Sequence, residues 1–369
     1  MMQMADFDRK LGEQLEQGML RLFQEGKSEQ EVGDWAADVV IKASEDSAPA
    51  VVKSLRRAAP RMLREHRKLA AGFDHRLRRD WGTGLGLMYA AIVACGEVGQ
   101  EFYVRQDTID SQVEVLAGLH ARAWRTAMEA HLLLSHGFPA GGMARARTLH
   151  ELAVVAGVIS GFGRQTGNED LAERYLLHGR VMAYKESLSY QAHADSIGYK
   201  KMTDEEMSEM QAEREALLQR FGASFASDNG WASEVSGNKA PRFVDLEKLA
   251  ELSHLRPYYT WASHSVHADS RGLALNQVEY RGHRVMVAGP TNVGLADPAQ
   301  LSLDAFLQCT VSLLLSPVDG PTSVMDQLAL HSLLLLIKEA KQELADVEPK
   351  IKAREALLAD STVADGQLT

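Results

Sequence analysis

The chain has 369 residues, 45% of them hydrophobic, and a formal net charge of -10 at pH 7, so it can bury one large core or two smaller ones. The acidic balance excludes a global electrostatic attraction to nucleic acid or anionic lipid. The sequence has two cysteines and no Cys-x-x-Cys pair, which excludes a zinc site built on cysteine and predicts two buried thiols. No cofactor motif is recognised.

The N-terminus lacks the basic segment and following apolar stretch of a secretory signal. The most apolar stretches, residues 85–95, 303–315 and 328–337, are shorter than the roughly 18 residues that span a bilayer. We therefore expect a cytoplasmic protein that does not act in a membrane.

The first third of the chain predicts helices separated by short breaks. Gly26 ends the first helix, and Ser28 with Glu31 forms a capping-box pattern at the start of the second. Glycines at 82, 84 and 86 are expected to break the helix that follows Pro49. The predicted helices cover residues 6–24, 28–44, 47–81 and 85–105.

The remaining sequence predicts further helices with few other elements. These helices cover residues 108–135, 140–159, 168–194, 203–221, 245–269, 302–315 and 322–358, and the one over 245–269 is expected to be interrupted or bent at Pro257. Residues 222–241 are rich in Ser, Asn, Gly and Ala and predict a mobile loop. Two short alternating runs within 277–287 predict a β-hairpin, which is the one convincing strand signal.

These elements predict an all-α fold: an antiparallel helical bundle with a helical N-terminal extension and one short hairpin. The expected domains are a helical region over residues 1–81, a bundle core over 82–360 and a disordered tail over 361–369.

The third predicted helix is strongly basic although the whole chain is acidic. One interpretation is a stripe that contacts the phosphates of a nucleic acid. The other is a solvated face that pairs with acidic helices of the same protein or of a second subunit. The candidate nucleic-acid-binding residues are Arg56, Arg57, Arg61, Arg64, Arg67 and Lys68.

Three polar side chains share one face of the helix predicted over 245–269. Tyr259, Ser263 and His267 are spaced four residues apart, about one helical turn each. The cluster could be catalytic or bind a ligand, or it could be a polar core with a satisfied histidine. A metal site that combines His267 with His264 and Asp269 is a further interpretation, without a supporting second motif.

Arg147 and Glu151 form a second polar pair, on the helix predicted over 140–159. The apolar run 152–159 makes this helix central, so a buried charge on it needs a partner. A spacing of four residues lets Glu151 serve as that partner.

On these positions the sequence resembles a bacterial all-helical family of unknown function, which has an Arg-x-x-x-Glu helix and a later Tyr-x-x-x-Ser-x-x-x-His helix. The resemblance covers about residues 85–269 and implies a bundle in which the two helices meet. Members are similar in places to the HEPN class of helical ribonucleases and toxins, by fold-level analogy.

HEPN ribonucleases place a His four to six residues after an Arg. The Arg holds the scissile phosphate and the His acts as acid or base, without a metal. Arg145 with His150 fits this spacing, and so does Arg61 with His66 in the basic helix. With 13 histidines in the chain, such matches also arise by chance.

The leading hypothesis is a metal-independent ribonuclease or toxin-like component of bacterial defence or stress response. His267, or else His150, would be the acid and base, while Arg147 would hold an anionic group and Glu151 would orient Arg147. Tyr259 and Ser263 would complete the pocket, and the basic helix would guide RNA or another anionic ligand. The alternative is a non-enzymatic ligand-sensing or protein-interaction module that acts through homo-oligomer or partner contacts.

Overall fold

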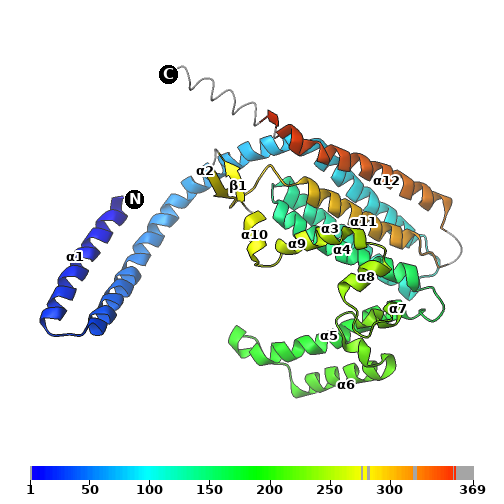
Figure 1. Cartoon of the computed structure of the whole chain (residues 1–369), viewed down its shortest axis with the longest axis horizontal. Coiled ribbons are helices and arrows are strands. Elements are labelled where there is room, and N and C mark those ends of the chain that lie inside the picture. Colours follow the sequence, from blue (N-terminus) through cyan, green and yellow to red (C-terminus); the bar gives the residue numbers. More distant parts are fainter. Residues whose placement is uncertain (1, 276, 281–282, 319–321, 352, 355–369) are drawn as a thin grey trace. The chain divides into compact units, whose positions relative to one another are not determined.

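The computed structural model describes residues 2–275, 277–280, 283–318, 322–351 and 353–354. Among these residues it has twelve α-helices and one two-stranded sheet, which confirms the all-α fold (Figure 1). The chain divides into two compact units between Asp74 and His75. We describe each unit by itself.

The N-terminal unit contains α1, Met2–Gln24, and the first part of α2, Glu29–Val104. The predicted capping box is confirmed, because the Glu31 carboxylate accepts from the Ser28 backbone N–H at 3.0 Å and the Glu31 N–H donates to Ser28 Oγ at 3.3 Å. Gly18 of α1 lies against the Trp35 ring, where an added Cβ would come within 1.8 Å. The two helices therefore pack closely around a glycine.

The predicted breaks in α2 are wrong, because one helix of 76 residues replaces three predicted ones. A glycine inside a helix costs only about 1 kcal/mol relative to alanine. Around the glycines, Trp81, Leu85 and Met88 are buried, and a Cβ on Gly84 would lie 3.0 Å from Leu344. Tertiary packing outweighs local helix propensity here.

One 18-residue window of α2 could cross a membrane by length and composition alone, but 44% of it is buried, as core helices also are.

Three helices form the centre of the second unit: α3, Ser111–Ser135, α4, Pro139–Phe162, and α11, Ala296–Leu314. They pack against one another, and α12, Val324–Ala345, packs on α11 (Figure 1). Both cysteines are buried free thiols, as predicted, with Cys95 on α2 and Cys309 on α11. Burial raises the pKa of the Cys95 thiol to about 12.

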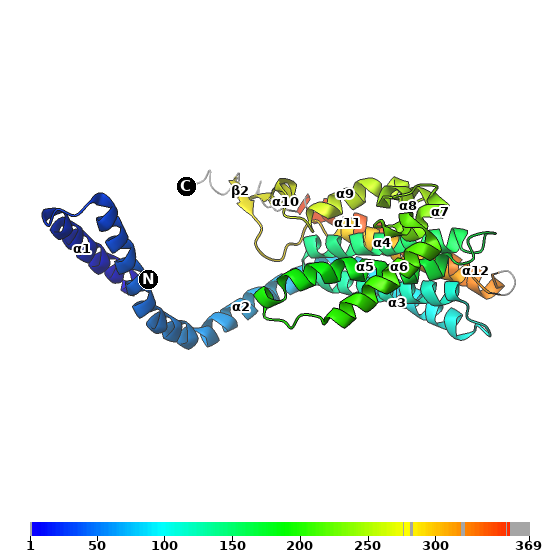
Figure 2. The ribbon, with the colours of Figure 1, turned by 90° about the horizontal axis from the view of Figure 1, so that it is seen from below.

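Helices α5, Leu171–His193, and α6, Asp204–Phe221, form a hairpin at one side of this unit (Figure 2). The capping box of Thr203 and Glu206 is confirmed at the start of α6. The prediction of a mobile loop over 222–241 is wrong, because Phe225 and Trp231 are 1% and 3% exposed. Short helical turns over 223–226 and 230–232 hold these rings against α5.

The helix predicted over 245–269 is two short helices. They are α8, Phe243–Leu249, and α9, Arg256–His264, with Pro257 in the first turn of α9. The small elements around them are α7, Ser233–Ser236, α10, Ser270–Leu275, β1, Gln277–Tyr280, and β2, His283–Met286. The strands pair antiparallel, so the hairpin is confirmed, while its turn at 281–282 and the tail at 361–369 lie outside the described residues.

Candidate functional site

Helices α4 and α9 meet at a cluster that joins an arginine, a tyrosine and a glutamate. Arg147 Nη2 donates to the Tyr259 hydroxyl at 2.9 Å, and that hydroxyl donates to Glu151 Oε1 at 3.0 Å. Arg147 Nε lies 3.2 Å from the same carboxylate oxygen, without hydrogen-bond geometry. The guanidinium carbon also lies 4.8 Å from the centre of the Tyr259 ring. The structure thus brings the predicted pair of Arg147 and Glu151 together with Tyr259, as the sequence predicted.

His267 joins this cluster from the chain that follows α9. Arg147 Nη1 lies 3.2 Å from His267 Nε2. Because a guanidinium can only donate, Nε2 is the acceptor in this contact, and a neutral His267 carries its proton on Nδ1. Once a bound anion takes Arg147 as its partner, the electron pair at Nε2 is available to accept a proton from a bound group.

Backbone contacts fix the position of His267. Its N–H donates to the Ser263 carbonyl at 2.9 Å, which continues the end of α9 by one turn. His264 Nδ1 lies 2.5 Å from Asp269 Oδ2, and Asp269 Oδ1 accepts from the Gly272 N–H at 2.8 Å. His264 and Asp269 therefore hold the turn between α9 and α10.

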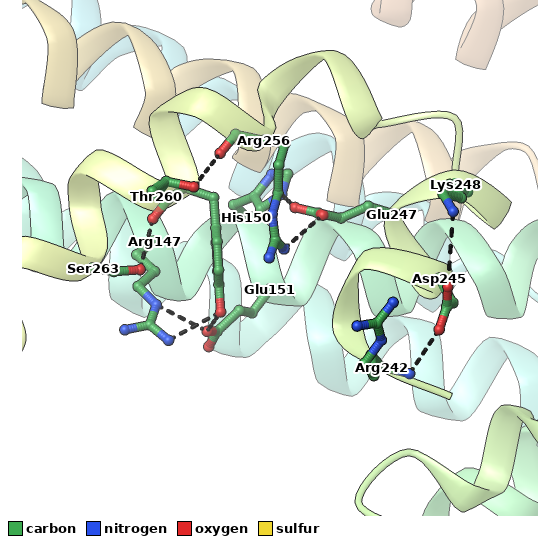
Figure 3. Close-up of polar contacts among 11 residues, drawn as sticks. Arg147, His150, Glu151, Arg242, Asp245, Glu247, Lys248, Arg256, Thr260 and Ser263 are labelled. Carbon is green, nitrogen blue, oxygen red and sulfur yellow. Dashed lines mark hydrogen bonds and ion pairs between the residues drawn. The ribbon is translucent and has the colours of Figure 1, made fainter. Parts of the chain in front are cut away.

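Ser263 does not take the predicted place in the cluster. Its hydroxyl donates to the Tyr259 backbone carbonyl at 2.8 Å, within α9 itself (Figure 3). A serine in a helix commonly satisfies its hydroxyl in this way. The Ser263 hydroxyl is therefore bonded within α9 and not to Arg147 or His267.

The cluster is open to solvent on one side. The Arg147 and Glu151 side chains are 18% and 40% exposed, and His267 is exposed. The neighbouring cavity, which includes His150 and Leu255 in its lining, has a volume of about 10 Å³, roughly the space of a single water molecule. A ligand at this site would therefore bind on the surface. Burial and the nearby Glu151 carboxylate raise the pKa of Tyr259, so its hydroxyl stays protonated at neutral pH.

A second cluster lies beside the first and includes Glu247 and Arg256, which were not predicted from the sequence. Glu247 of α8 is fully buried and accepts from His150 Nε2 at 2.9 Å and from Arg256 Nη1 at 2.8 Å (Figure 3). Burial lowers the pKa of His150 although Glu247 opposes that shift. Arg256 also lies over the Tyr259 ring, at 5.1 Å from its centre. No spacing in the sequence links Glu247 to α4.

The structure does not bring Arg145 and His150 together. Arg145 donates to Glu129 of α3 at 3.2 Å, whereas His150 is 6% exposed and bonded to Glu247. Five helical residues separate two side chains by about 140° around the axis. The Arg-x4-His spacing therefore does not form a joint site on α4.

The six candidate nucleic-acid-binding residues of α2 lie in the N-terminal unit. Arg61 is paired with Glu65 at 3.9 Å, and both side chains are well exposed, so this pair contributes little to stability. All six candidate nucleic-acid-binding side chains are exposed: Arg56, Arg57, Arg61, Arg64, Arg67 and Lys68.

Comparison with known proteins gave one match. Residues 113–281 match the model of a family of unknown function (DUF5677). This region runs from α3 into the β-hairpin and contains the whole cluster of Arg147, Glu151, Tyr259 and His267. Neither the curated proteins nor the solved structures gave a match.

Proposed function

We propose that the cluster between α4 and α9 is the active site of a metal-independent ribonuclease, acting in bacterial defence or stress response. The supporting observation is the 3.2 Å contact between Arg147 Nη1 and His267 Nε2, from positions 120 residues apart, at a surface open to solvent. A cation beside a basic imidazole is the pair needed to bind a phosphodiester and deprotonate a neighbouring hydroxyl.

In this proposal the phosphate of the RNA displaces His267 from Arg147 and takes the guanidinium as its partner. His267 Nε2 then removes the proton of the 2′-hydroxyl, and the 2′-oxygen forms a bond to phosphorus. The bond from phosphorus to the 5′-oxygen breaks, and the leaving oxygen takes a proton from solvent. The products are a 2′,3′-cyclic phosphate and a 5′-hydroxyl. Tyr259 and Glu151 hold the guanidinium in place.

The shape of the site favours an extended substrate over a small ligand. Small-molecule sites usually enclose a few hundred cubic ångströms, whereas the cavity beside Arg147 has about 10 Å³. An RNA backbone presents its phosphates on the outside and needs no enclosed pocket. The N-terminal unit has its own exposed basic face on α2, a kind of surface that binds phosphates.

One observation favours the alternative, a non-enzymatic interaction module. Helix α12 exposes a run of large apolar side chains at its start, with Val324, Met325 and Leu328 at 80%, 67% and 58% exposure. Exposed apolar surface of this kind commonly marks a protein contact. In this alternative the α4–α9 cluster only stabilises the bundle.

An expression experiment in a bacterial host distinguishes the ribonuclease from the interaction module. We expect wild-type protein to slow growth and fragment total RNA, and expect both effects to disappear in His267→Ala and Arg147→Ala at equal soluble protein. Thr260→Ala is a matched control, because Thr260 is exposed on α9 and bonds only its own helix. Intact RNA with soluble wild-type protein would reject the ribonuclease in favour of the interaction module.

A further inference from the structure

A cavity of about 260 Å³ lies between α2 and the last turn of α12 with the residues that follow it. Both walls of this cavity belong to the second unit. Gly84 of α2 lets the walls approach closely, because a Cβ at this position would lie 3.0 Å from the Leu344 side chain. A cavity of about 150 Å³ is already large enough to hold benzene, so this one has room for a small organic molecule.

Asp80 is the centre of a group of cations at one end of the cavity. Its Oδ1 accepts from Arg354 Nη1 at 2.8 Å and from Arg79 Nε at 2.9 Å. Its Oδ2 accepts from Arg354 Nη2 and Asn292 Nδ2, both at 2.8 Å, and from Arg79 Nη2 at 3.1 Å. The hydrogen bonds from Arg354 and Arg79 hold the pKa of Asp80 below its usual range, and its side chain is 5% exposed. The carboxylate is therefore ionised and its acceptor positions are occupied.

The cations around Asp80 retain donors for a further acceptor. Arg79 uses Nε and Nη2 to bond Asp80, which leaves the N–H groups of Nη1, and half of its side chain is exposed. Lys350 is exposed and forms no ion pair with the residues that the structure describes. It precedes Arg354 by four residues, a spacing that puts side chains next to each other on a helix. Three positive charges against the one negative charge of Asp80 leave this cationic end with a net charge of +2.

Glu343 gives the other end of the cavity a different chemistry. It precedes Lys350 by seven residues, which is about two helical turns or roughly 10 Å. A carboxylate repels a second anionic group but accepts hydrogen bonds from neutral donors such as hydroxyl groups. The exposed hydroxyl of Thr83, on the α2 wall, can bond the same groups. The cavity therefore suits a molecule that is anionic at one end and carries hydroxyl groups at the other.

We propose that this cavity binds a small organic phosphate, with its phosphate group at the cationic end formed by Arg79, Lys350 and Arg354. The hydroxyl groups of the ligand lie toward Glu343. A phosphate monoester has a charge of about −1.5 to −2 at pH 7, which matches the net charge of the cationic end. Guanidinium groups bind phosphate oxygens through strong charge-assisted hydrogen bonds. A ligand with a single carboxylate would leave part of the positive charge unmatched.

The charged lining of this cavity fits a metal ion less well than an anion. A divalent cation needs several oxygen ligands, but Asp80 is bonded to two guanidiniums, and Glu343 is the remaining carboxylate of the lining. The proposed phosphate site does not rest on the proposed ribonuclease, because it has no residue in common with the cluster between α4 and α9. A bound ligand would contact both α2 and the C-terminal residues, so it should stabilise the folded chain.

Isothermal titration calorimetry of the full-length protein with ribose 5-phosphate tests the proposal. We expect one site per chain with a dissociation constant below about 1 mM. Ribose, which lacks the phosphate, and inorganic phosphate, which lacks the sugar, should each bind at least about tenfold more weakly. Lys350→Ala removes one cation of the site and should also weaken binding at least about tenfold. Lys338→Ala is the matched control, because Lys338 is an exposed lysine of α12 outside the cavity lining, and it should leave the affinity unchanged.

Thermal unfolding distinguishes a variant that fails to bind from one that fails to fold. Wild type and Lys350→Ala should unfold at the same temperature without ligand, and ribose 5-phosphate should raise the unfolding temperature of the wild type more. No binding by folded wild type, or equal affinity of wild type and Lys350→Ala, would overturn the proposal. Equally tight binding of inorganic phosphate would contradict the organic part of the ligand. Binding of Mg²⁺ alone, lost in Glu343→Gln, would assign the cavity to a cation instead.

Discussion

Helix α4 carries two polar clusters that differ in their access to solvent. Glu247 is fully buried between His150 and Arg256. Arg147 and Glu151 lie within one turn of His150 on α4, yet their side chains reach solvent beside Tyr259. Both clusters join α4 to the segment that contains α8 and α9. The first uses its charges to hold the helices together, and the second retains charges that a ligand can reach.

The two clusters share a physical connection through Tyr259. Its ring lies 5.6 Å from His150 and 4.9 Å from Phe243, and its hydroxyl bonds Arg147 and Glu151. A rigid buried cluster thus supports the ring whose hydroxyl fixes the accessible arginine. Supporting contacts of this kind keep a site in its productive geometry.

Removal of Glu247 should have the largest effect on stability. Glu247→Ala leaves the buried His150 without its acceptor, while the half-exposed Arg256 turns to solvent, so we expect a loss of about 2 kcal/mol in the free energy of unfolding. Glu151→Ala is the matched change in the open cluster and should cost no more than about 1 kcal/mol. Urea denaturation of both variants measures the difference, and equal losses would remove the distinction between a structural and an accessible cluster.

His120, a buried histidine whose partner is a hydroxyl and not a carboxylate, should make the free energy of unfolding depend on pH. Burial lowers the pKa of His120 to about 4, although a hydrogen bond with the Cys95 backbone opposes the shift, and its Nε2 lies 3.1 Å from the Thr310 hydroxyl. Since the unfolded chain binds this proton near pH 6.5, unfolding is favoured as the pH falls from about 6.5 to 4, by about 3 kcal/mol. His120→Asn should flatten this part of the curve of unfolding free energy against pH.

The pKa of His150 is also lowered, but the Glu247 carboxylate opposes that shift. His150→Asn should therefore flatten the same curve less than His120→Asn does. A larger change for His150 would mean that Glu247 does not stabilise the histidinium.

The Tyr259 hydroxyl should matter more for function than for stability. Tyr259→Phe keeps the ring contacts but removes the bonds to Arg147 and Glu151, which should cost about 1 kcal/mol of unfolding free energy. With the guanidinium less well held, RNA cleavage should fall by at least about tenfold, as loss of positioning commonly does. A large loss of stability with unchanged cleavage would place Tyr259 in the structural cluster.

Substitution of His267 should have the smallest effect on stability. His267 is exposed and contacts Arg147 through one ring nitrogen, so His267→Ala should change the unfolding free energy by less than about 0.5 kcal/mol. Thermal unfolding followed by circular dichroism measures this. A clear drop in the unfolding temperature would mean that the open cluster is part of the scaffold.

Local signals in the sequence predicted much of the fold. Capping boxes at Ser28 and Thr203 and the spacing of Arg147 and Glu151 involve residues within one helical turn, and the structure reproduces them. The glycines in α2 misled the prediction because buried contacts around Trp81 and Leu85 keep the helix continuous. Residues 222–241 were misassigned because the burial of Trp231 depends on α5.

The candidate site was predicted only where one helix supplies its pattern. Tyr259 of α9 and His267, in the chain just after α9, could be found from their spacing, and both meet Arg147. The Ser263 hydroxyl fits the same spacing but bonds its own helix. Glu247 could not be found, because its link to His150 spans 97 residues and depends on how α8 packs on α4.

We propose that Arg147 and His267 together cleave RNA without a metal. The most direct measurement is the cleavage of a single-stranded RNA oligonucleotide by purified protein in excess EDTA, with the new termini identified by mass spectrometry. We predict 2′,3′-cyclic phosphate and 5′-hydroxyl ends for the wild type, and rates at least about 100-fold lower for His267→Ala. No cleavage by folded wild type, or an unchanged rate in His267→Ala, would contradict the account.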